Sequence, residues 1–242
     1  MRALIKQAIK RLIYADKADS QTYVASLRKA GCKIGERVTF YRPMMTTIDT
    51  TRPWLIEIGD DVQITEGVTI LTHGYDWSVL KRVYGDVIGS AGRVSIGNNV
   101  FIGMKTTILK GCRIGSNVII GANSLVNKDI PDNCVAAGNP IKIVMTLEEY
   151  YEKRKREWVG EAVELVQKYR ARYGREPDVM ALREHFWLFS NDYDSLPEPW
   201  KHVMTLVGNE AESREKFANH TPMYPSLEEF LRSIDEPHGE VR

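Results

Sequence analysis

Aliphatic residues recur at every sixth position through the middle of the chain. They are Ile58, Ile64 and Ile70, followed by Ile96, Ile102, Ile108, Ile114, Ile120 and Val126. Glycine directly follows many of them, and the fourth residue after each is small or β-branched. A period of six fits neither an α-helix, which repeats about every 3.6 residues, nor the two-residue alternation of a plain strand. It predicts a coil of short parallel strands joined by tight corners, with one aliphatic side chain per strand pointing inward.

The third residue after each aliphatic is expected to occupy a corner of this coil. Asparagine, aspartate and glycine dominate the position, and they tolerate left-handed backbone conformations. The expected corner residues are Asp61, Gly67, His73, Asn99, Lys105, Gly111, Asn117, Asn123 and Asp129. A sandwich of short strands is the alternative, but it would show alternation and variable turn spacing. The pattern therefore favours a parallel β-helix.

The repeat loses its phase between Ile70 and Ile96, because their separation of 26 residues is not a multiple of six. A loop is expected to leave the coil near Gly74 and to return near Val94, over about residues 74–93. The polar and aromatic residues of this loop are Asp76, Trp77, Lys81, Arg82 and Tyr84. Loops that leave a rigid scaffold commonly carry binding groups. His73 is then the last corner residue before the loop.

The segment "VSIGNNVFIGMKTTILKGCRIGSNVIIGANSLVNKDIPDNCVAAGNPIKIV" resembles the hexapeptide-repeat acyltransferases with a left-handed parallel β-helix, in particular the galactoside, maltose and capsule-type O-acetyltransferases. The motifs "NNVFIG", "NKDIP" and "AAGNPIKIV" carry this resemblance, which covers about residues 32–145. It implies a mainly β fold with a left-handed coil. It also implies acetyl transfer from acetyl-CoA to a hydroxyl of a carbohydrate or nucleotide-sugar acceptor, as in surface polysaccharide biosynthesis.

His73 stands in "ILTHGYD", which is similar to the context of the catalytic base in these acetyltransferases, although Gly74 replaces their common proline. A neutral imidazole can take the proton of a sugar hydroxyl near neutral pH. Residue chemistry alone leaves a structural role open, whereas the resemblance implies that His73 is the general base. Asp76 or Glu66 could orient its ring, and a backbone carbonyl is the alternative.

The same resemblance implies a coenzyme A site between neighbouring subunits of a homotrimer. The residues implied to contact the cofactor are Gly103, Met104, Gly121, Ala122, Lys128, Ala137, Gly138, Pro140 and Lys142. The glycines could instead serve only the corners, and Lys128 could be a solvated charge. The acceptor is expected to meet Asp76, Trp77 and Tyr84 of the loop together with Phe101, which stands where galactoside-type members often have tryptophan.

Two alternatives to a sugar O-acetyltransferase remain open. An N-acetyltransferase acting on an amino-sugar nucleotide would use the same scaffold with an amine acceptor. A non-catalytic β-helix scaffold would not bind acetyl-CoA. One histidine in the repeat region cannot form a three-histidine metal site, so no metal is expected.

Composition restricts the partners and the compartment. A net charge of +1 disfavours a nucleic-acid partner. Three cysteines without a CxxC pair favour a reducing compartment, so a cytoplasmic location is expected. No stretch is long and apolar enough to span a membrane. Residues 3–13 predict a basic amphipathic helix, for which packing on a neighbouring surface is favoured over peripheral membrane contact.

Helical segments are expected on both sides of the β-helix, with domain ranges of 1–31, 32–145 and 146–242. A helix over about 20–30 would cover the first coil. Thr146 and Glu149 form a capping-box pattern that begins a helix over 147–173, and Ser226 and Glu229 repeat it. Further helices are expected in "PDVMALREHFWLF", "EPWKHVMTLV" and "SLEEFLRSI". The aromatic residues expected to form the core of this extension are Trp158, Phe186, Trp187, Phe189 and Trp200.

Overall fold

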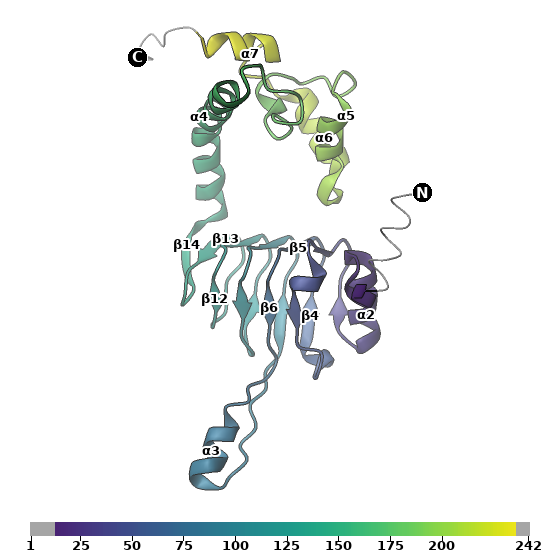
Figure 1. The fold of residues 1–242 in the computed structure, drawn as a ribbon, viewed down its shortest axis with the longest axis vertical. Coiled ribbons are helices and arrows are strands. Elements are labelled where there is room, and N and C mark those ends of the chain that lie inside the picture. Colours follow the sequence, from purple (N-terminus) through teal and green to yellow (C-terminus); the bar gives the residue numbers. More distant parts are fainter. Residues whose placement is uncertain (1–12, 236–242) are drawn as a thin grey trace. The chain divides into compact units, whose positions relative to one another are not determined.

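The chain divides into two compact units, residues 1–151 and 152–242. The computed structural model describes residues 13–235 of them, so the helix expected over 3–13 lies almost wholly outside the described residues. The first unit contains a stack of short strands, and the second is helical (Figure 1). Each unit is described by itself below.

The strands of the first unit form three sheets. Sheet A contains β1 (Lys33–Ile34), β4 (Ile56–Ile58), β7 (Val94–Ile96) and β10 (Arg113–Ile114). Sheet B contains β2 (Thr39–Phe40), β5 (Val62–Ile64), β8 (Val100–Ile102), β11 (Val118–Ile120), β13 (Cys134–Ala137) and β14 (Lys142–Thr146). Sheet C contains β3 (Thr47–Ile48), β6 (Thr69–Ile70), β9 (Thr107–Ile108) and β12 (Leu125–Val126). All pairs are parallel except β13 with β14. The first four coils each contribute one strand to each sheet, which is typical of a hexapeptide β-helix, and β13 and β14 then extend sheet B alone.

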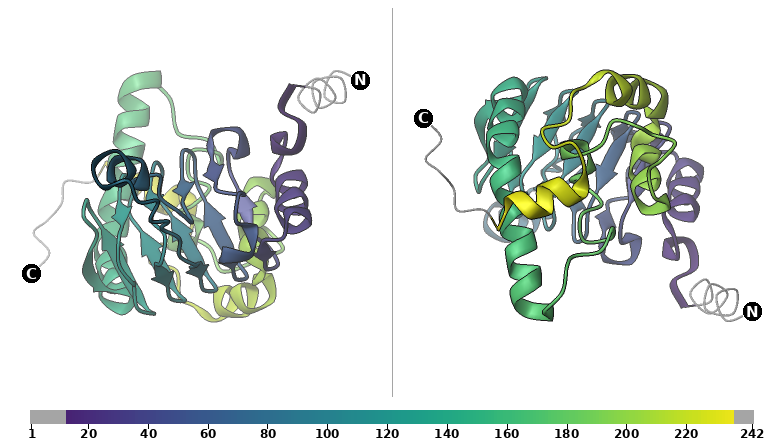
Figure 2. Two further views of the ribbon diagram at one scale, coloured as in Figure 1. Left: turned by 90° about the horizontal axis from the view of Figure 1, so that it is seen from below. Right: turned by 90° about the horizontal axis from the view of Figure 1, so that it is seen from above.

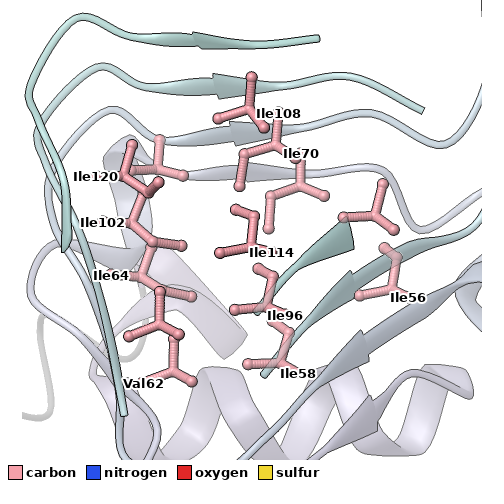
Figure 3. Packing of buried hydrophobic residues seen from close by; sticks show 14 of the residues in the cluster. Ile56, Ile58, Val62, Ile64, Ile70, Ile96, Ile102, Ile108, Ile114 and Ile120 are labelled. Atoms are coloured by element: carbon pink, nitrogen blue, oxygen red, sulfur yellow. The ribbon is translucent and has the colours of Figure 1, made fainter. Parts of the chain in front are cut away.

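The aliphatic residues of the six-residue repeat form three columns inside the coil. Ile58 pairs with Ile96 in sheet A, Ile64 with Ile102 in sheet B, and Ile70 with Ile108 in sheet C. Their side chains point toward the centre of the coil and are nearly completely buried (Figure 3). Each such burial contributes about 1.5–3 kcal/mol of hydrophobic free energy. The columns therefore stabilise the coil and set its register.

The corner prediction is confirmed at most of the expected positions. The residues with positive φ, between 54° and 82°, are Asp61, Gly67, Asn99, Lys105, Gly111, Asn117 and Asn123. The prediction is wrong at His73 and Asp129, which are not among the residues with positive φ. At His73 the chain leaves the coil, and between Val126 and Ile130 the coil is shortened so that Ile130 lies beside Ile114.

A ladder of polar side chains follows the corner between sheets A and B. The N–H of Asp60 donates to Asn98 Oδ1 (2.8 Å), the N–H of Asn98 to Ser116 Oγ (3.0 Å), and the N–H of Ser116 to Asp132 Oδ1 (2.9 Å). Each side chain thus satisfies a backbone donor of the coil below it. These bonds explain why a short polar residue follows several of the Ile-Gly pairs.

The helix expected over 20–30 is confirmed as α2 (Ser20–Ala30), with Asp19 as its N-cap and Gly31 at φ 110° after its end. Tyr23 and Leu27 are buried in the same core as the first coil, and the Tyr23 ring lies edge-on to Phe40 at 4.9 Å. Helix α2 lies at one end of the β-helix and β14 at the other (Figures 1 and 2). It thereby covers the aliphatic columns where the first coil would otherwise expose them.

The helices of the second unit are partly as expected. Helix α4 (Leu147–Tyr173) begins at the predicted capping box, in which Glu149 Oε2 accepts from the Thr146 N–H (2.7 Å). Helices α5 (Glu198–Met204) and α7 (Leu227–Ser233) also lie in the expected segments, whereas α6 (Glu210–Asn219) was not expected. Helix α7 crosses α4, and the Arg170 guanidinium donates to the Leu231 carbonyl there (Figure 2).

The prediction of a helix in "PDVMALREHFWLF" is wrong. That segment folds into turns and a short 3₁₀ helix over Phe186–Leu188. Phe186, Leu188 and Phe189 are all buried, and on an α-helix they would span about 160° of the circumference, wider than the stripe of about 100° that a surface helix needs to bury. The aromatic residues expected in the core do lie there, with Trp158 and Trp187 only partly buried.

The fold class needs one correction. The chain is 39% helical, so "mainly β" holds for the stacked coil and not for the whole protein. The reason is the helical unit after residue 151, together with α2 and α3 (Trp77–Tyr84). Within residues 13–235, no helix combines the length and apolar character that crossing a bilayer requires.

Consecutive coils stack so closely that the position directly after several aliphatic residues of the repeat has no room for a side chain. A Cβ built on Gly59 would lie 2.7 Å from the Gly97 carbonyl oxygen and in contact with Asn98. We expect Gly59→Ala to lower the free energy of unfolding by about 3 kcal/mol, or roughly 6–12 °C in thermal midpoint. Gly89→Ala is the control, because nothing lies within 4 Å of its added Cβ. Equal midpoints for the two variants, measured by circular dichroism, would contradict this packing account.

Candidate active site

His73 stands at the point where the chain leaves sheet C. It follows β6 by three residues and forms an antiparallel bridge with Ala91. The Gly74 N–H donates to the Ser90 carbonyl (3.1 Å), and the Gly92 N–H donates to the Thr72 carbonyl (2.9 Å). The excursion is therefore an arm whose two ends are hydrogen-bonded together at the coil. This pairing fixes the backbone of His73 on both sides.

The His73 ring is held by a buried aspartate of the preceding coil. His73 Nδ1 lies 2.5 Å from Asp49 Oδ2, and the Asp49 side chain is only 6% exposed. Thr51 donates to Asp49 Oδ1 through its N–H (3.1 Å) and its hydroxyl (2.6 Å). Thr72 donates to Oδ2 through the same two groups, at 3.1 and 2.6 Å. Asp49 is thus fixed by four donors besides the imidazole.

These hydrogen bonds keep Asp49 ionised. Burial alone would raise the pKa of the Asp49 carboxyl, but the donors of Thr51, Thr72 and His73 outweigh it and hold this pKa well below its usual range. A buried carboxylate that accepts from Nδ1 fixes the tautomer of the imidazole, so that Nδ1 carries the hydrogen and Nε2 has the lone pair. The His73 side chain is 30% exposed, and Nε2 has no hydrogen-bond partner among residues 13–235. The arrangement can accept a proton at Nε2.

Neither carboxylate proposed to orient His73 makes this contact. Glu66 pairs with Arg42 (2.9 Å), and Asp76 precedes the first residue of α3. The sequence reasoning missed Asp49 because the first coil contains extra residues, which obscure the six-residue phase there. In the structure Ile48 pairs with Ile70 in sheet C, so the residue after Ile48 lies beside the segment leading to His73.

Of the residues expected to bind the acceptor, Asp76 lies beside Gly74, next to His73, whereas the other three do not gather around His73 within one chain. Trp77 and Tyr84 belong to α3, at the end of the arm and away from the β-helix (Figure 1). Tyr84 is 73% exposed, and the Trp77 ring packs against Tyr75 at 4.7 Å. Phe101 points outward from sheet B and is 41% exposed.

Most of the residues expected to bind coenzyme A lie along the corner between sheets B and C. They are Gly103 and Met104 after β8, Gly121 and Ala122 after β11, and Ala137 and Gly138 at the end of β13. Consecutive coils stack closely there, since the Gly103 N–H donates to the Ile120 carbonyl and the Gly121 N–H to the Ala136 carbonyl. Cβ atoms on Gly103 and Gly121 would contact Ala122 and Ala137, so the stacking alone explains these two glycines.

The remaining expected cofactor residues lie elsewhere on the coil. Lys128 is exposed and follows β12, on the same corner between sheets C and A that carries His73 after β6. Pro140 follows a cis peptide bond and precedes β14, in which Lys142 is the exposed first residue. The outward side chains of sheet C, such as Thr69 and Thr107, separate His73 from the Gly103 corner of its own chain.

Comparisons with protein families, with known sequences and with solved structures agree with one another. Residues 93–128 match the family described as bacterial transferase hexapeptide (six repeats). Protein CapG of Staphylococcus aureus is 38% identical over 153 residues, which cover 63% of this chain and 83% of that protein. Galactoside O-acetyltransferase of Escherichia coli (strain K12) is 38% identical over 104 residues, covering 41% of this chain and only 50% of the relative. A solved galactoside acetyltransferase in complex with coenzyme A is 28% identical, with a TM-score of 0.40 and coverage of 58% of this chain and 82% of that one.

The ionised state of Asp49 predicts an acid-dependent contribution to stability. Because its folded pKa lies below the unfolded value of about 3.9, the contribution is complete above about pH 4 and is lost as the pH falls through the folded pKa. We expect Asp49→Asn to cost about 2 kcal/mol at pH 7 and distinctly less at pH 3. Thermal unfolding of both proteins at several pH values measures this difference. Asp86→Asn, at an exposed position of the arm, should show no such trend; a wild-type advantage that stays constant down to pH 3 would argue against the assignment.

Proposed function

Because the chain belongs to the hexapeptide-repeat acetyltransferases, we propose that it transfers an acetyl group from acetyl-CoA to a hydroxyl of a carbohydrate acceptor, with His73 as the general base. The observation that carries this proposal is the His73–Asp49 pair at the root of the arm. The name of the relative from E. coli, a galactoside O-acetyltransferase, supports a sugar acceptor. Surface polysaccharide assembly is the setting we propose.

The proposed reaction is a direct transfer without an acyl-enzyme. Nε2 of His73 takes the proton of the acceptor hydroxyl as its oxygen attacks the thioester carbonyl. The tetrahedral intermediate then collapses, the C–S bond breaks, and the thiolate of coenzyme A leaves and takes the proton from the imidazolium. The three cysteines are buried, and burial raises the pKa of each thiol, so none is suited to act as a nucleophile.

Asp49 acts in this scheme as a positioning residue. Its carboxylate keeps the hydrogen on Nδ1, so that Nε2 faces the acceptor with its lone pair. Once the ring is protonated, the same carboxylate stabilises the imidazolium at 2.5 Å. Thr51 and Thr72 hold the carboxylate in place, and their hydroxyls have little freedom because each already donates at 2.6 Å.

The active site is proposed to form between two chains of a homotrimer. Within one chain, the corner that carries Gly103 and Met104 is separated from His73 by the outer face of sheet C. The aromatic residues of α3 also lie away from their own coil (Figure 1). A neighbouring copy would bring a Gly103 corner to His73, and Lys128 on the His73 corner would then meet a phosphate of the cofactor. The exposed valines of the arm, Val79 and Val83, are available for contact with that copy.

An N-acetyltransferase remains the second candidate, because the same base could serve an amine acceptor. A non-catalytic β-helix scaffold is disfavoured, because the chain belongs to a family of acetyltransferases. A thiol-release assay over sugars, nucleotide sugars, amino-sugar nucleotides and oligosaccharides identifies the acceptor class. Release only with amino sugars that carry a free amine would replace the O-acetyltransferase proposal with the second candidate.

Substitution at the pair should lower turnover without weakening acetyl-CoA binding. We expect His73→Ala to reduce kcat by about 10²–10⁴-fold, the usual contribution of a general base. Asp49→Asn should reduce it by about 10–100-fold, the range for residues that orient a functional histidine. Thiol release gives kcat and KM, and calorimetry gives the Kd of acetyl-CoA. Glu66→Gln is the matched control and should stay within about three-fold of wild type; a His73→Ala enzyme with equal turnover would remove His73 from the mechanism.

The number of chains in the assembly tests the trimer proposal directly. Native mass spectrometry of the full chain should give three copies, and dilution that dissociates the trimer should abolish thiol release because each site needs two chains. A His73→Ala chain mixed with wild type should lower activity in proportion to the sites that lose the base. A monomer with full turnover would exclude the site between chains.

A further inference from the structure

The helical unit contains a groove that the proposed reaction does not use. It has a volume of about 580 Å³ and is lined by Leu165, Lys168, Tyr169, Arg172, Tyr173 and Ala181. The first five follow the pattern i, i+3, i+4, i+7, i+8 along α4 and therefore form one stripe on the helix. We call this surface the α4 groove.

Two tyrosines form an aromatic platform in the α4 groove. The rings of Tyr169 and Tyr173 lie 4.7 Å apart at an angle of 51°, and Tyr173 is 62% exposed. The guanidinium of Arg175 lies 5.4 Å from the centre of the Tyr169 ring. A tyrosine with this exposure presents a rigid apolar face and a polar tip, which is a common basis for recognition. The Tyr173 ring is therefore the part of the platform that is available to a ligand.

The charge beside this platform is positive. Lys168 and Arg172 line the groove and are exposed, and Arg175 adjoins it. Among the described residues that line it, none is an aspartate or glutamate. The acidic Glu176 and Asp235 pair with Arg170 instead, at 2.9 and 2.8 Å. An anionic ligand thus meets two cations and no carboxylate in the lining, with a third cation, Arg175, beside it.

We propose that the α4 groove is a non-catalytic docking site for an acidic polysaccharide. A pyranose ring presents a flat C–H face that can pack on a tyrosine, and its carboxylate can pair with a guanidinium in the two-bond geometry that arginine favours. The proposal rests on the proposed function, in that the polymer held here is of the class that His73 would acetylate. Single-stranded nucleic acid is the other polyanion that such a surface could bind, and the net charge of +1 disfavours it.

The consequence for the reaction is a preference for long acceptors. A polymer held at the α4 groove would reach the catalytic site at a raised effective concentration, as long as it is long enough to occupy both. A short acceptor cannot occupy both and gains nothing. The groove should therefore lower KM for long acidic chains and leave the acetylation of short acceptors unchanged.

The test measures binding without acetyl-CoA, so that it does not depend on catalysis. Fluorescence anisotropy on the full-length protein compares labelled polygalacturonate with neutral dextran and single-stranded DNA of similar length. Wild type should bind polygalacturonate, more weakly as salt is raised. Lys168→Ala/Arg172→Ala should weaken that binding by about 10-fold or more, and Tyr173→Ala by several-fold. Arg156→Ala, at an exposed position of α4 outside the groove, is the matched control and should bind as wild type does.

The outcomes of this test distinguish a failure of the docking site from a failure of the proposed catalytic function. No binding of polygalacturonate by wild type, or equal binding by wild type and the double variant, would overturn the docking site whether or not thiol release is seen. DNA bound as tightly as polygalacturonate, through the same residues, would overturn it in favour of a nucleic-acid surface. Binding that follows the variants, in a protein that releases no thiol with any acceptor, would leave the docking site standing and remove the proposed function.

Discussion

Parallel stacking of short strands in exact register is the constraint on which the rest of this structure depends. Each coil must place its aliphatic residue directly over that of the coil before it, as Ile58 and Ile96 do. Because the coils approach so closely, Gly59 and Gly97 cannot carry a side chain without a clash. The polar residues at the corners satisfy backbone donors of the neighbouring coil. Hydrophobic burial, backbone conformation and hydrogen bonding therefore select the same six-residue repeat.

The candidate site depends on the same register between neighbouring coils. Ile48 lies beside Ile70 in sheet C, which brings Asp49 under the segment that leads to His73. Burying a carboxylate is unfavourable unless its oxygens are hydrogen-bonded, and Thr51 and Thr72 provide those bonds. The rigid coil thus supplies what a general base needs: a fixed ring, a fixed tautomer and one nitrogen that faces outward.

The sequence was sufficient for the regular part of the fold and insufficient where the repeat is interrupted. The period of six predicts the strands and most corners, because one residue type is required at each position, as at Asn99 and Asn117. It could not reveal Asp49, since insertions in the first coil hide which residues share a level. The pattern after Pro177 predicts a helix, whereas the structure buries Phe186, Leu188 and Phe189 through turns and a short 3₁₀ helix. Tertiary contacts override local pattern in both cases.

The way the arm is closed at its base has an evolutionary consequence. Its two ends are joined by the hydrogen bonds from Gly74 to Ser90 and from Gly92 to Thr72, directly beside the coil. Lengthening a loop whose ends are already fixed costs only about 0.6 kcal/mol for each doubling of its length. The arm can therefore gain, lose or exchange residues without altering the coils below it. Selection can thus remodel the arm while His73 and Asp49 stay in place.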